Sequence, residues 1–277
     1  FARLKRVDLV NVHYVALLPL GVFVKWICGA RLVYDTHELE TESIDFGGIR
    51  KLAAKRIERT FIRYADLVIV VSEGIRAWYA DAYGLSNLVT VLNCPRMEHP
   101  VPGRRLHDEL RIPDGRRIVI HQGGLVRGRG IEPLLDAFAA HDDQKHVLVL
   151  MGYGELEPLV KQYAASHRNI YFKEAVPPAV MLQYTASAHV GIAYIDNTSL
   201  NDHFCLPNKL FEYIMSGLPV MVNNVPEMRR VVTENQLGVV LEELTPQSLA
   251  RALDEIDRMD REALKAREQI PQAALRA

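Results

Sequence analysis

Residues Arg117 to Phe138 read RIVIHQGGLVRGRGIEPLLDAF and give the clearest indication of the fold class. This stretch opens with an apolar, β-branched run, continues through a loop with four glycines and two arginines, and ends in an amphipathic run that begins at Ile131. This order predicts a buried strand, a glycine loop and a helix. Such loops lie at the carboxyl ends of parallel strands, where backbone N–H groups and a helix N-terminus attract anions.

Strand and helix patterns keep alternating on the C-terminal side of this stretch. Strands are predicted at Arg117–His121, His146–Met151, Asn169–Phe172, His189–Ala193, Pro219–Val222 and Gly238–Leu241. Helices are predicted at Ile131–Ala140, Glu155–Ser166, Pro178–Ser187, Lys209–Ser216, Pro226–Glu234 and from about Pro246. This alternation predicts a complete doubly wound parallel-sheet domain, which we place at residues 99–255.

The N-terminal side has the same rhythm but fewer strands. They are predicted at Val7–His13, Leu32–Tyr34, Leu67–Val71 and Leu88–Leu92. Helical patterns cover Tyr14–Ala30, Lys51–Tyr64 and the segment between two cap residues, Ser72 and Gly84. A complete nucleotide-binding fold has about six strands. We therefore expect residues 1–98 to form a partial domain whose opening strands lie outside this sequence.

Prolines and glycines interrupt the alternation between Cys94 and Gly115, which predicts a linker and a domain boundary. The expected architecture is an α/β fold with two Rossmann-like, doubly wound parallel-sheet domains that face each other across a cleft, the first of them incomplete. We expect residues 256–277 to form a C-terminal helix that packs back on the first domain.

Composition excludes several classes of function. The 277 residues are 49% hydrophobic and 24% charged, with a formal net charge of -1, so no global field predicts binding to nucleic acid. The three cysteines are odd in number and lack zinc-site spacing, which predicts reduced thiols in a cytoplasmic protein. The apolar stretch Tyr14–Ala30 contains a proline and a lysine and is too short to span a membrane. It predicts a buried helix, although peripheral contact with the inner face of a membrane stays open.

Three strand-to-helix loops of the second domain carry candidate chemistry. In the first, Arg127 or Arg129 could hold a phosphate, because a guanidinium offers bidentate donors. The second contains Gly152 and Gly154 and either packs against a nucleotide or forms a plain tight turn. The sequence predicts no metal site and no cofactor.

The third loop leads into the segment PNKLFEYIMSGLPV, which begins at Pro207. Glu212 lies about one turn inside this largely apolar helix and needs a partner, because an unpaired buried charge is very costly. A pair of ribose hydroxyls is one such partner. Lys209, three residues earlier, is the other, unless it meets a phosphate instead.

Taken together, GGLVRGRGIEPLLDAF, MGYGELEPL and PNKLFEYIMSGLPVM, in this order and spacing, resemble the retaining glycosyltransferases of family four, which have the GT-B fold. VYDTHELETE, ADLVIVVSEGI and VLNCP resemble the acceptor domain of the same family. The resemblance implies transfer of a sugar from a nucleoside diphosphate to an acceptor hydroxyl with retention, without an obligatory metal ion.

The resemblance also implies roles for single residues. Glu212 would hold the ribose hydroxyls, His37 would face the donor sugar, and His13 together with His37 would contact the acceptor. We assign catalysis to His37, Arg129 and Lys209. Contacts with the donor are expected from Gly123, Gly124, Arg127, Arg129, Gly152, Gly154, Asn208, Lys209, Leu210 and Glu212.

This chain departs from the family pattern at three positions. Gly124 stands where the family has an arginine, and Arg129 stands where it has a lysine. Phe204 occupies the position of a glutamate that lies near the donor sugar. Recognition of the sugar could pass to the Cys205–Asn208 loop, or to the neighbouring Asn201 and Asp202.

The expected partners are a nucleoside diphosphate sugar and a carbohydrate or lipid-linked acceptor, in the synthesis of a cell-surface polysaccharide or glycolipid. Two alternatives remain open. A nucleotide-sugar epimerase of the same fold would turn over its substrate without an acceptor. A non-catalytic protein would bind the nucleotide sugar without turnover. A phosphorylase is disfavoured, because no pyridoxal lysine site is visible in the sequence.

Overall fold

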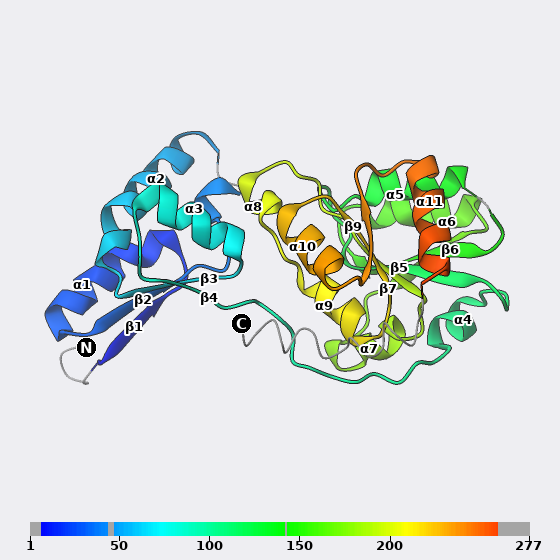
Figure 1. Ribbon diagram of the computed structural model, residues 1–277, viewed down its shortest axis with the longest axis horizontal. Helices are drawn as coiled ribbons and strands as arrows, with labels where there is room; N and C mark the ends of the chain where they lie inside the picture. The colour runs from blue at the N-terminus through cyan, green and yellow to red at the C-terminus, as the bar shows by residue number, and fades with distance from the viewer. Residues whose placement is uncertain (1–6, 44–46, 142, 260–277) are drawn as a thin grey trace. The chain divides into compact units, whose positions relative to one another are not determined.

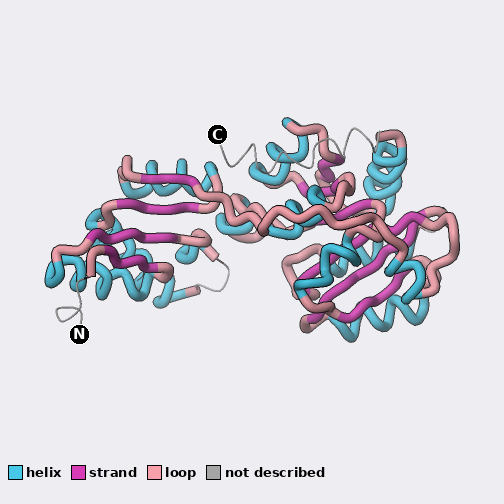
Figure 2. Tube along the Cα trace, turned by 90° about the horizontal axis from the view of Figure 1, so that it is seen from below, coloured by secondary structure: helices cyan, strands magenta, loops and turns pink. Residues whose placement is uncertain are grey.

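The structure is a computed structural model that describes residues 7–43, 47–141 and 143–259. The chain divides into two compact units. The first consists of Phe1–Asn93 and Asn197–Leu206, and the second of Cys94–Asp196 and Pro207–Ala277. Each unit is built on one parallel sheet, whose strands run side by side in Figure 2.

The first unit has a four-stranded sheet in the order β1-β2-β3-β4. Its strands are β1 (Leu9–Val12), β2 (Arg31–Asp35), β3 (Leu67–Val70) and β4 (Leu88–Thr90). The connecting helices, seen in Figure 1, are α1 (Leu18–Cys28), α2 (Gly48–Phe61) and α3 (Glu73–Tyr83). These elements confirm the predicted strands and helices. Ser72 caps α3 through its side chain, and Gly84 ends it in the left-handed conformation, as predicted.

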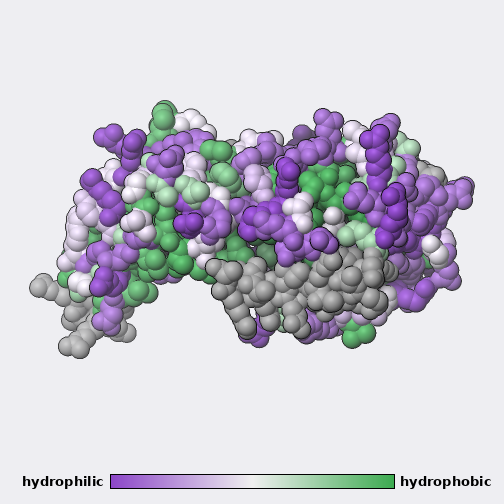
Figure 3. Space-filling model, in the orientation of Figure 1, coloured by the Kyte–Doolittle hydropathy of each residue, from purple (hydrophilic) through white to green (hydrophobic). Residues whose placement is uncertain are grey.

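The expectation of a buried helix over the apolar stretch was wrong for one face of α1. Its buried residues are Leu18, Gly21 and Val22, which pack towards the sheet. Other large apolar side chains of this helix are more than 45% exposed, namely Leu20, Phe23, Trp26 and Ile27. Figure 3 shows hydrophobic residues gathered in a patch on the visible face of the first unit.

Among the described helices, none combines the length and the apolar character needed to cross a membrane.

A segment from later in the chain completes the first unit. Residues 197–206 include the short helix α8 (Leu200–His203). The Phe204 side chain packs against the first unit's hydrophobic core, and its carbonyl accepts a 3.0 Å hydrogen bond from the Ser72 hydroxyl. Asn201 accepts a 2.9 Å hydrogen bond from the Leu39 N–H. The aromatic ring at position 204 therefore has a packing role.

The second unit has a six-stranded sheet in the order β10-β9-β8-β5-β6-β7. Its strands are β5 (Arg117–Gly124), β6 (His146–Tyr153), β7 (Ile170–Glu174), β8 (Val190–Ala193), β9 (Val220–Asn223) and β10 (Gly238–Leu241). The chain adds strands on one side of β5 and then, from β8 onwards, on the other side. The doubly wound topology predicted for the second domain is thus confirmed.

Helices cover both faces of this sheet. Their bounds are α4 (Arg105–Leu110), α5 (Ile131–Ala140), α6 (Glu157–Ser166), α7 (Pro178–Thr185), α9 (Asn208–Met215), α10 (Pro226–Glu234) and α11 (Pro246–Asp257). Apolar side chains of α5, α6 and α11 share one core with the strands. The helix α7 contacts both α4 and α9. The helix α4 was not predicted, because it lies in the proline-rich linker. The packing expected for residues 256–277 falls mostly on 260–277, outside the described residues.

A buried carboxylate ties the first unit together. Glu58 of α2 is fully buried and accepts hydrogen bonds from four hydroxyl groups. They belong to Tyr34 in β2, Thr41 in the turn after it, and Tyr79 and Tyr83 in α3, at 2.7–3.2 Å. Burial raises the pKa of Glu58 above its ordinary value, although the hydroxyl donors oppose this rise.

Replacing Glu58 with glutamine should change how stability depends on pH. A folded-state pKa above 4.5 means that ionisation of Glu58 costs stability as the pH rises through that raised pKa, whereas below 4.5 the carboxyl is protonated in both states. We expect the wild type to lose stability relative to Glu58→Gln as the pH rises above 4.5 and through the raised pKa of Glu58. Urea unfolding followed by tryptophan fluorescence measures it, because both tryptophans, Trp26 and Trp78, lie in the first unit.

The matched control is Glu98→Gln, which changes an exposed glutamate of the second unit. Its stability difference from the wild type should not change with pH when followed by the same fluorescence. A constant difference for Glu58→Gln across the pH range would contradict the assigned burial cost.

Candidate functional site

The second sheet opens at the carboxyl end of β5. This strand pairs with β6 along its whole length, up to Gly124 opposite Tyr153. Its pairing with β8, on the other side, covers only Val119 and Ile120. The chain reverses its direction of winding between β5 and β8, and ligands of open α/β sheets bind in the crevice at such a point. The candidate site is therefore at the end of β5.

A tyrosine holds the two strands apart. The Tyr213 hydroxyl, from α9, accepts a 3.0 Å hydrogen bond from the Gln122 N–H of β5 and donates at 3.3 Å to the Ile192 carbonyl of β8. The ring fits because residue 191 is glycine, where a Cβ would lie 2.2 Å from a ring carbon of Tyr213. This contact fixes α9 against the end of β5.

Lys209, one turn before Tyr213, reaches over the glycine loop. A Cβ on Gly123 would lie 3.7 Å from its Nζ, so the ammonium lies directly above this exposed glycine. The same Nζ is 3.4 Å from Nε2 of His121. Burial, with the charge of Lys209 adding to it, holds the pKa of His121 well below its ordinary value. His121 is therefore neutral at pH 7 and presents a lone pair to the lysine.

Glu212 is oriented by an amide from β5. Gln122 Nε2 donates to Glu212 Oε2 at 2.6 Å, and the Thr185 hydroxyl donates to Gln122 Oε1 at 2.7 Å. Burial raises the pKa of Glu212, while the Gln122 hydrogen bond and the charge of Lys209 oppose the rise. Within the described residues, Glu212 Oε1 has no hydrogen-bond partner. One oxygen of a half-buried carboxylate can thus accept hydroxyl donors.

The two loop arginines differ in burial. Arg127 is exposed, and its backbone N–H donates to Glu155 at 3.2 Å, whereas Arg129 is half-buried. The charge of Arg129 contributes to the low pKa of His121. In the part of the chain that the structure describes, neither guanidinium forms an ion pair. The structure thus brings positive charge to the loop from α9 and from the loop itself.

The remaining candidates of this unit lie around these residues in different ways. Asn208 is exposed at the first position of α9, and the Leu210 side chain is fully buried. Gly152 and Gly154 lie against backbone, because a Cβ would come within 1.8 Å of the Gly123 carbonyl oxygen and 2.4 Å of that of Leu125. Both glycines therefore shape the loop by close packing of one backbone on another.

The two histidines predicted to contact the sugars lie in the first unit, at the ends of neighbouring strands. His13 follows β1, His37 follows β2, and His13 Nδ1 is 2.9 Å from His37 Nε2. Asp35 Oδ2 lies 3.5 Å from the same nitrogen of His13, and the Asn11 amide lies 3.2 Å from its Nε2. His13 and His37 are exposed, and Asp35 is half-buried.

The residues that orient these side chains were not predicted from the sequence. Gln122, Thr185 and Tyr213 received no role, although each is a polar residue in an apolar element. Gln122 could have been proposed as a site residue, because it is a polar residue near the end of a buried strand. The same holds for Asp35 at the end of β2. The alternative partner for Glu212, Lys209, acts on its pKa, but the hydrogen bond comes from Gln122.

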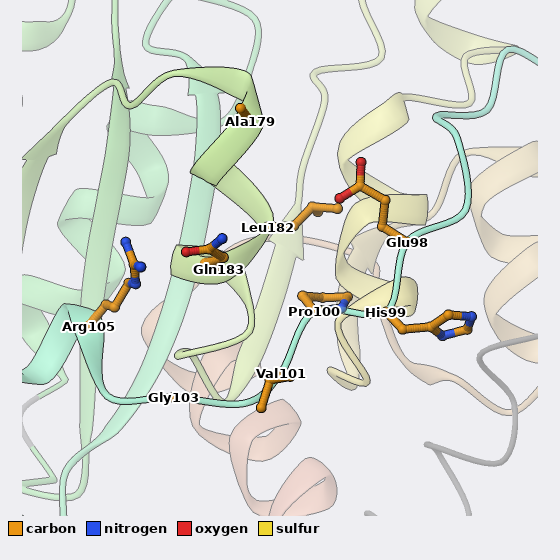
Figure 4. A pocket seen from close by; sticks show the side chains of 9 residues that line it. All are labelled: Glu98, His99, Pro100, Val101, Gly103, Arg105, Ala179, Leu182 and Gln183. Atoms are coloured by element: carbon orange, nitrogen blue, oxygen red, sulfur yellow. The ribbon is translucent and has the colours of Figure 1, made fainter.

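A separate surface pocket of about 420 Å³ lies between the extended segment 98–103 and α7. Glu98 and Arg105 lie at its opposite ends in Figure 4. It contains none of the predicted site residues, so we assign it no part in the candidate site.

Comparison with known families identifies the class of protein. Residues 116–257 match the family described as "Glycosyl transferases group 1", and residues 1–95 match "Glycosyltransferase Family 4". The chain thus belongs to the group 1, family 4 glycosyltransferases. This bears out the resemblance seen in the sequence.

Individual relatives agree with the family. The chain is 23% identical to a protein named probable glycosyltransferase WbjE of Pseudomonas aeruginosa, over 95% of this chain and 69% of the relative. It is 24% identical to a D-inositol 3-phosphate glycosyltransferase of Corynebacterium urealyticum, over 97% and 68%. Among solved structures, Anabaena Alr3699/HepE in complex with UDP superposes with a TM-score of 0.77 at 18% identity, over 95% and 73%. A glycosyltransferase from Rickettsia africae also gives 0.77, at 12% identity, over 99% and 73%. The chain has the GT-B fold.

Substitution of Gly152 by alanine tests the close packing beneath the glycine loop. The added methyl would lie 1.8 Å from the Gly123 carbonyl oxygen, so β5 and β6 must shift. Overpacking against backbone costs about 1–3 kcal/mol, and the melting temperature should fall by several degrees. Circular dichroism measures the melt. Gly124→Ala is the control, because its Cβ would meet only Val126 at an ordinary 3.7 Å. Equal melting temperatures for the two variants would contradict this geometry.

Proposed function

We propose that this glycosyltransferase moves a sugar from a nucleoside diphosphate to an acceptor hydroxyl with retention at the anomeric carbon. The observation that carries the proposal is the convergence, at the end of β5, of Lys209, an exposed glycine backbone and a half-buried carboxylate. Residues 99–255 would bind the donor, and residues 1–98 would bind the acceptor.

The diphosphate would lie over the glycine loop. Arg129 and Lys209 would neutralise it, with Arg127 as a more exposed third cation. Backbone N–H groups of Gly123 and Gly124, and those of Asn208 and Leu210 at the start of α9, would add donors, because a helix N-terminus attracts anions. As the bond to the sugar breaks, these groups would stabilise the charge that develops on the departing diphosphate. Gly152 and Gly154 would contribute indirectly, by holding the loop in place.

Glu212 would accept hydrogen bonds from the ribose hydroxyls. Gln122 donates a hydrogen bond to Oε2 of Glu212. This hydrogen bond restricts rotation of the carboxyl group, so Oε1 has a defined direction. The raised pKa of Glu212 does not disturb this role, because a carboxyl group that keeps an acceptor oxygen binds hydroxyls in either protonation state. UDP is a reasonable nucleotide to test, since the related HepE structures contain UDP and UDP-glucose.

In the first unit, His37 would contact the donor sugar and His13 the acceptor. Their hydrogen bond gives each imidazole a defined orientation. The acceptor would be a carbohydrate or a lipid-linked carbohydrate, in the synthesis of a cell-surface polysaccharide or glycolipid. Nothing in this scheme requires a metal ion, because the cations Arg129 and Lys209 supply the positive charge.

Alanine variants of Arg129 and Glu212 test the proposal directly. With UDP-glucose as donor, Arg129→Ala should lower kcat/KM about 100-fold, because it removes a cation that acts on the departing diphosphate. Glu212→Ala should mainly weaken UDP binding, by about 10-fold, because it removes hydrogen bonds to the nucleoside, and one to a charged group is worth about 1.5–3 kcal/mol. Transfer kinetics and calorimetric titration with UDP measure the two effects.

Arg168→Ala, at an exposed position of the second unit, is the control and should behave as the wild type. Near-normal kinetics for both site variants would remove the assignment. The same assay separates the alternatives. Turnover of the nucleotide sugar without an acceptor would indicate an epimerase, and binding without turnover in the presence of acceptors would indicate a binding protein.

Peripheral membrane contact is the last part of the proposal. Exposed Leu20, Phe23 and Trp26 on α1 support it, together with the exposed Arg50 and Arg56 on the adjacent α2. Apolar side chains next to basic ones favour the surface of an anionic bilayer. We expect the protein to float with vesicles that contain anionic lipid, and Phe23→Ser/Trp26→Ser to reduce the bound fraction severalfold. Equal flotation of the double variant and the wild type would argue against this contact.

A further inference from the structure

The cluster at the ends of β1 and β2 has a composition that its proposed contact with sugars does not require. His13, Asp35 and His37 each offer one ligand atom, and these atoms all lie within 4.8 Å of one another. Two imidazoles and one carboxylate are ligands that a divalent transition metal ion accepts. Exposure of both histidines leaves room for water molecules to complete the coordination.

The separations of the ligand atoms suit a metal ion. Nitrogen and oxygen ligands lie about 2.0–2.1 Å from zinc, which in tetrahedral geometry puts them roughly 3.4 Å from one another. His13 Nδ1 is 2.9 Å from His37 Nε2 and 3.5 Å from Asp35 Oδ2. Small rotations of the His13 and His37 side chains would therefore convert the hydrogen-bonded cluster into a coordination site. The strand ends that carry them are fixed by the parallel pairing of β1 with β2.

A second layer of support is present on His13. A histidine that binds a metal through one nitrogen usually donates a hydrogen bond from the other nitrogen, which fixes its orientation. The Asn11 amide lies 3.2 Å from His13 Nε2, on the side away from the cluster. A flip of this amide would present its carbonyl oxygen to an Nε2–H group, and so free Nδ1 to bind the ion.

From these contacts we infer that His13, Asp35 and His37 form a binding site for one zinc-like divalent ion, with Asn11 orienting His13. Two imidazole ligands favour zinc, cobalt, nickel or copper over magnesium and calcium. Three protein ligands leave at least one position to water, as in an open site. The bound ion would occupy His37 Nε2.

Occupation of this nitrogen has a consequence that rests on the proposed function. His37 cannot coordinate an ion through Nε2 and contact the donor sugar with the same nitrogen. Zinc would therefore inhibit transfer rather than assist it, and a chelator would restore the activity.

Calorimetric titration of the untagged full chain with zinc chloride tests the site. We expect one high-affinity ion per chain. His13→Ala and His37→Ala should each abolish this binding, and Asn11→Ala should weaken it by about 10- to 100-fold, the usual effect of losing a group that orients a ligand. His167→Ala, which changes a histidine of the second unit, is the matched control and should bind zinc as the wild type does.

Cobalt binding can be measured by absorption spectroscopy, which is independent of the calorimetric titration. Cobalt bound by two imidazoles and a carboxylate should absorb visible light, and this absorption should disappear in His13→Ala although circular dichroism shows the variant folded. Absence of stoichiometric zinc binding, or equal binding by wild type and both histidine variants, would overturn the inference. Stoichiometric binding without inhibition of transfer would support the metal site and contradict the role proposed for His37, so the two ideas fail separately.

Discussion

One hydroxyl group decides the shape of the second sheet. Tyr213 accepts a hydrogen bond from β5 and donates one to β8, and so occupies the space in which the two strands would otherwise continue their ladder. The strands pair only at Val119 and Ile120, and beyond that point the end of β5 is free to carry a loop. The missing side chain at Gly191 makes room for the ring. Position and orientation of α9, and with them those of Lys209 and Glu212, follow from this contact.

Burial and charge act together on the polar groups around this loop. His121 is neutral because it is fully buried next to a lysine. A neutral imidazole can accept a hydrogen bond from the Lys209 ammonium without charge repulsion. Glu212 is shifted in the opposite sense, towards its protonated form, because partial burial outweighs the help of Gln122 and Lys209. Both pKa shifts act in the direction that lowers the cost of burying a charged group. The free energy of burying ions is reduced by changing their protonation.

Most of the fold could be predicted, because each unit consists of elements with a clear period. The helices Ile131–Ala140 and Pro226–Glu234 begin and end at the predicted residues. The short helices α4 and α8 escaped prediction, since six and four residues are too few to show a period. The outer face of α1 was also misjudged, because an apolar sequence does not reveal which of its side chains find a packing partner.

The candidate site was predictable only as a set of loops. Glycines, arginines and Glu212 could be found from their positions relative to strands and helices. The hydrogen bond between Gln122 and Glu212 joins residues 90 positions apart, and no local pattern encodes such a pair. Phe204 shows the same limit, because its ring packs on a core made by residues more than a hundred positions earlier in the chain. These contacts depend on the tertiary fold, whereas the motifs depend on neighbours in sequence.

The glycine loop has a consequence for how this chain can change in evolution. Gly123 and Gly152 pack against each other through their main chains. The chemistry of these peptide groups does not depend on the neighbouring side chains. A ligand held partly by peptide groups keeps those contacts when a neighbouring charged residue is exchanged. Substitution of Arg127 or Arg129 would then leave the main-chain contacts between Gly123 and Gly152 in place.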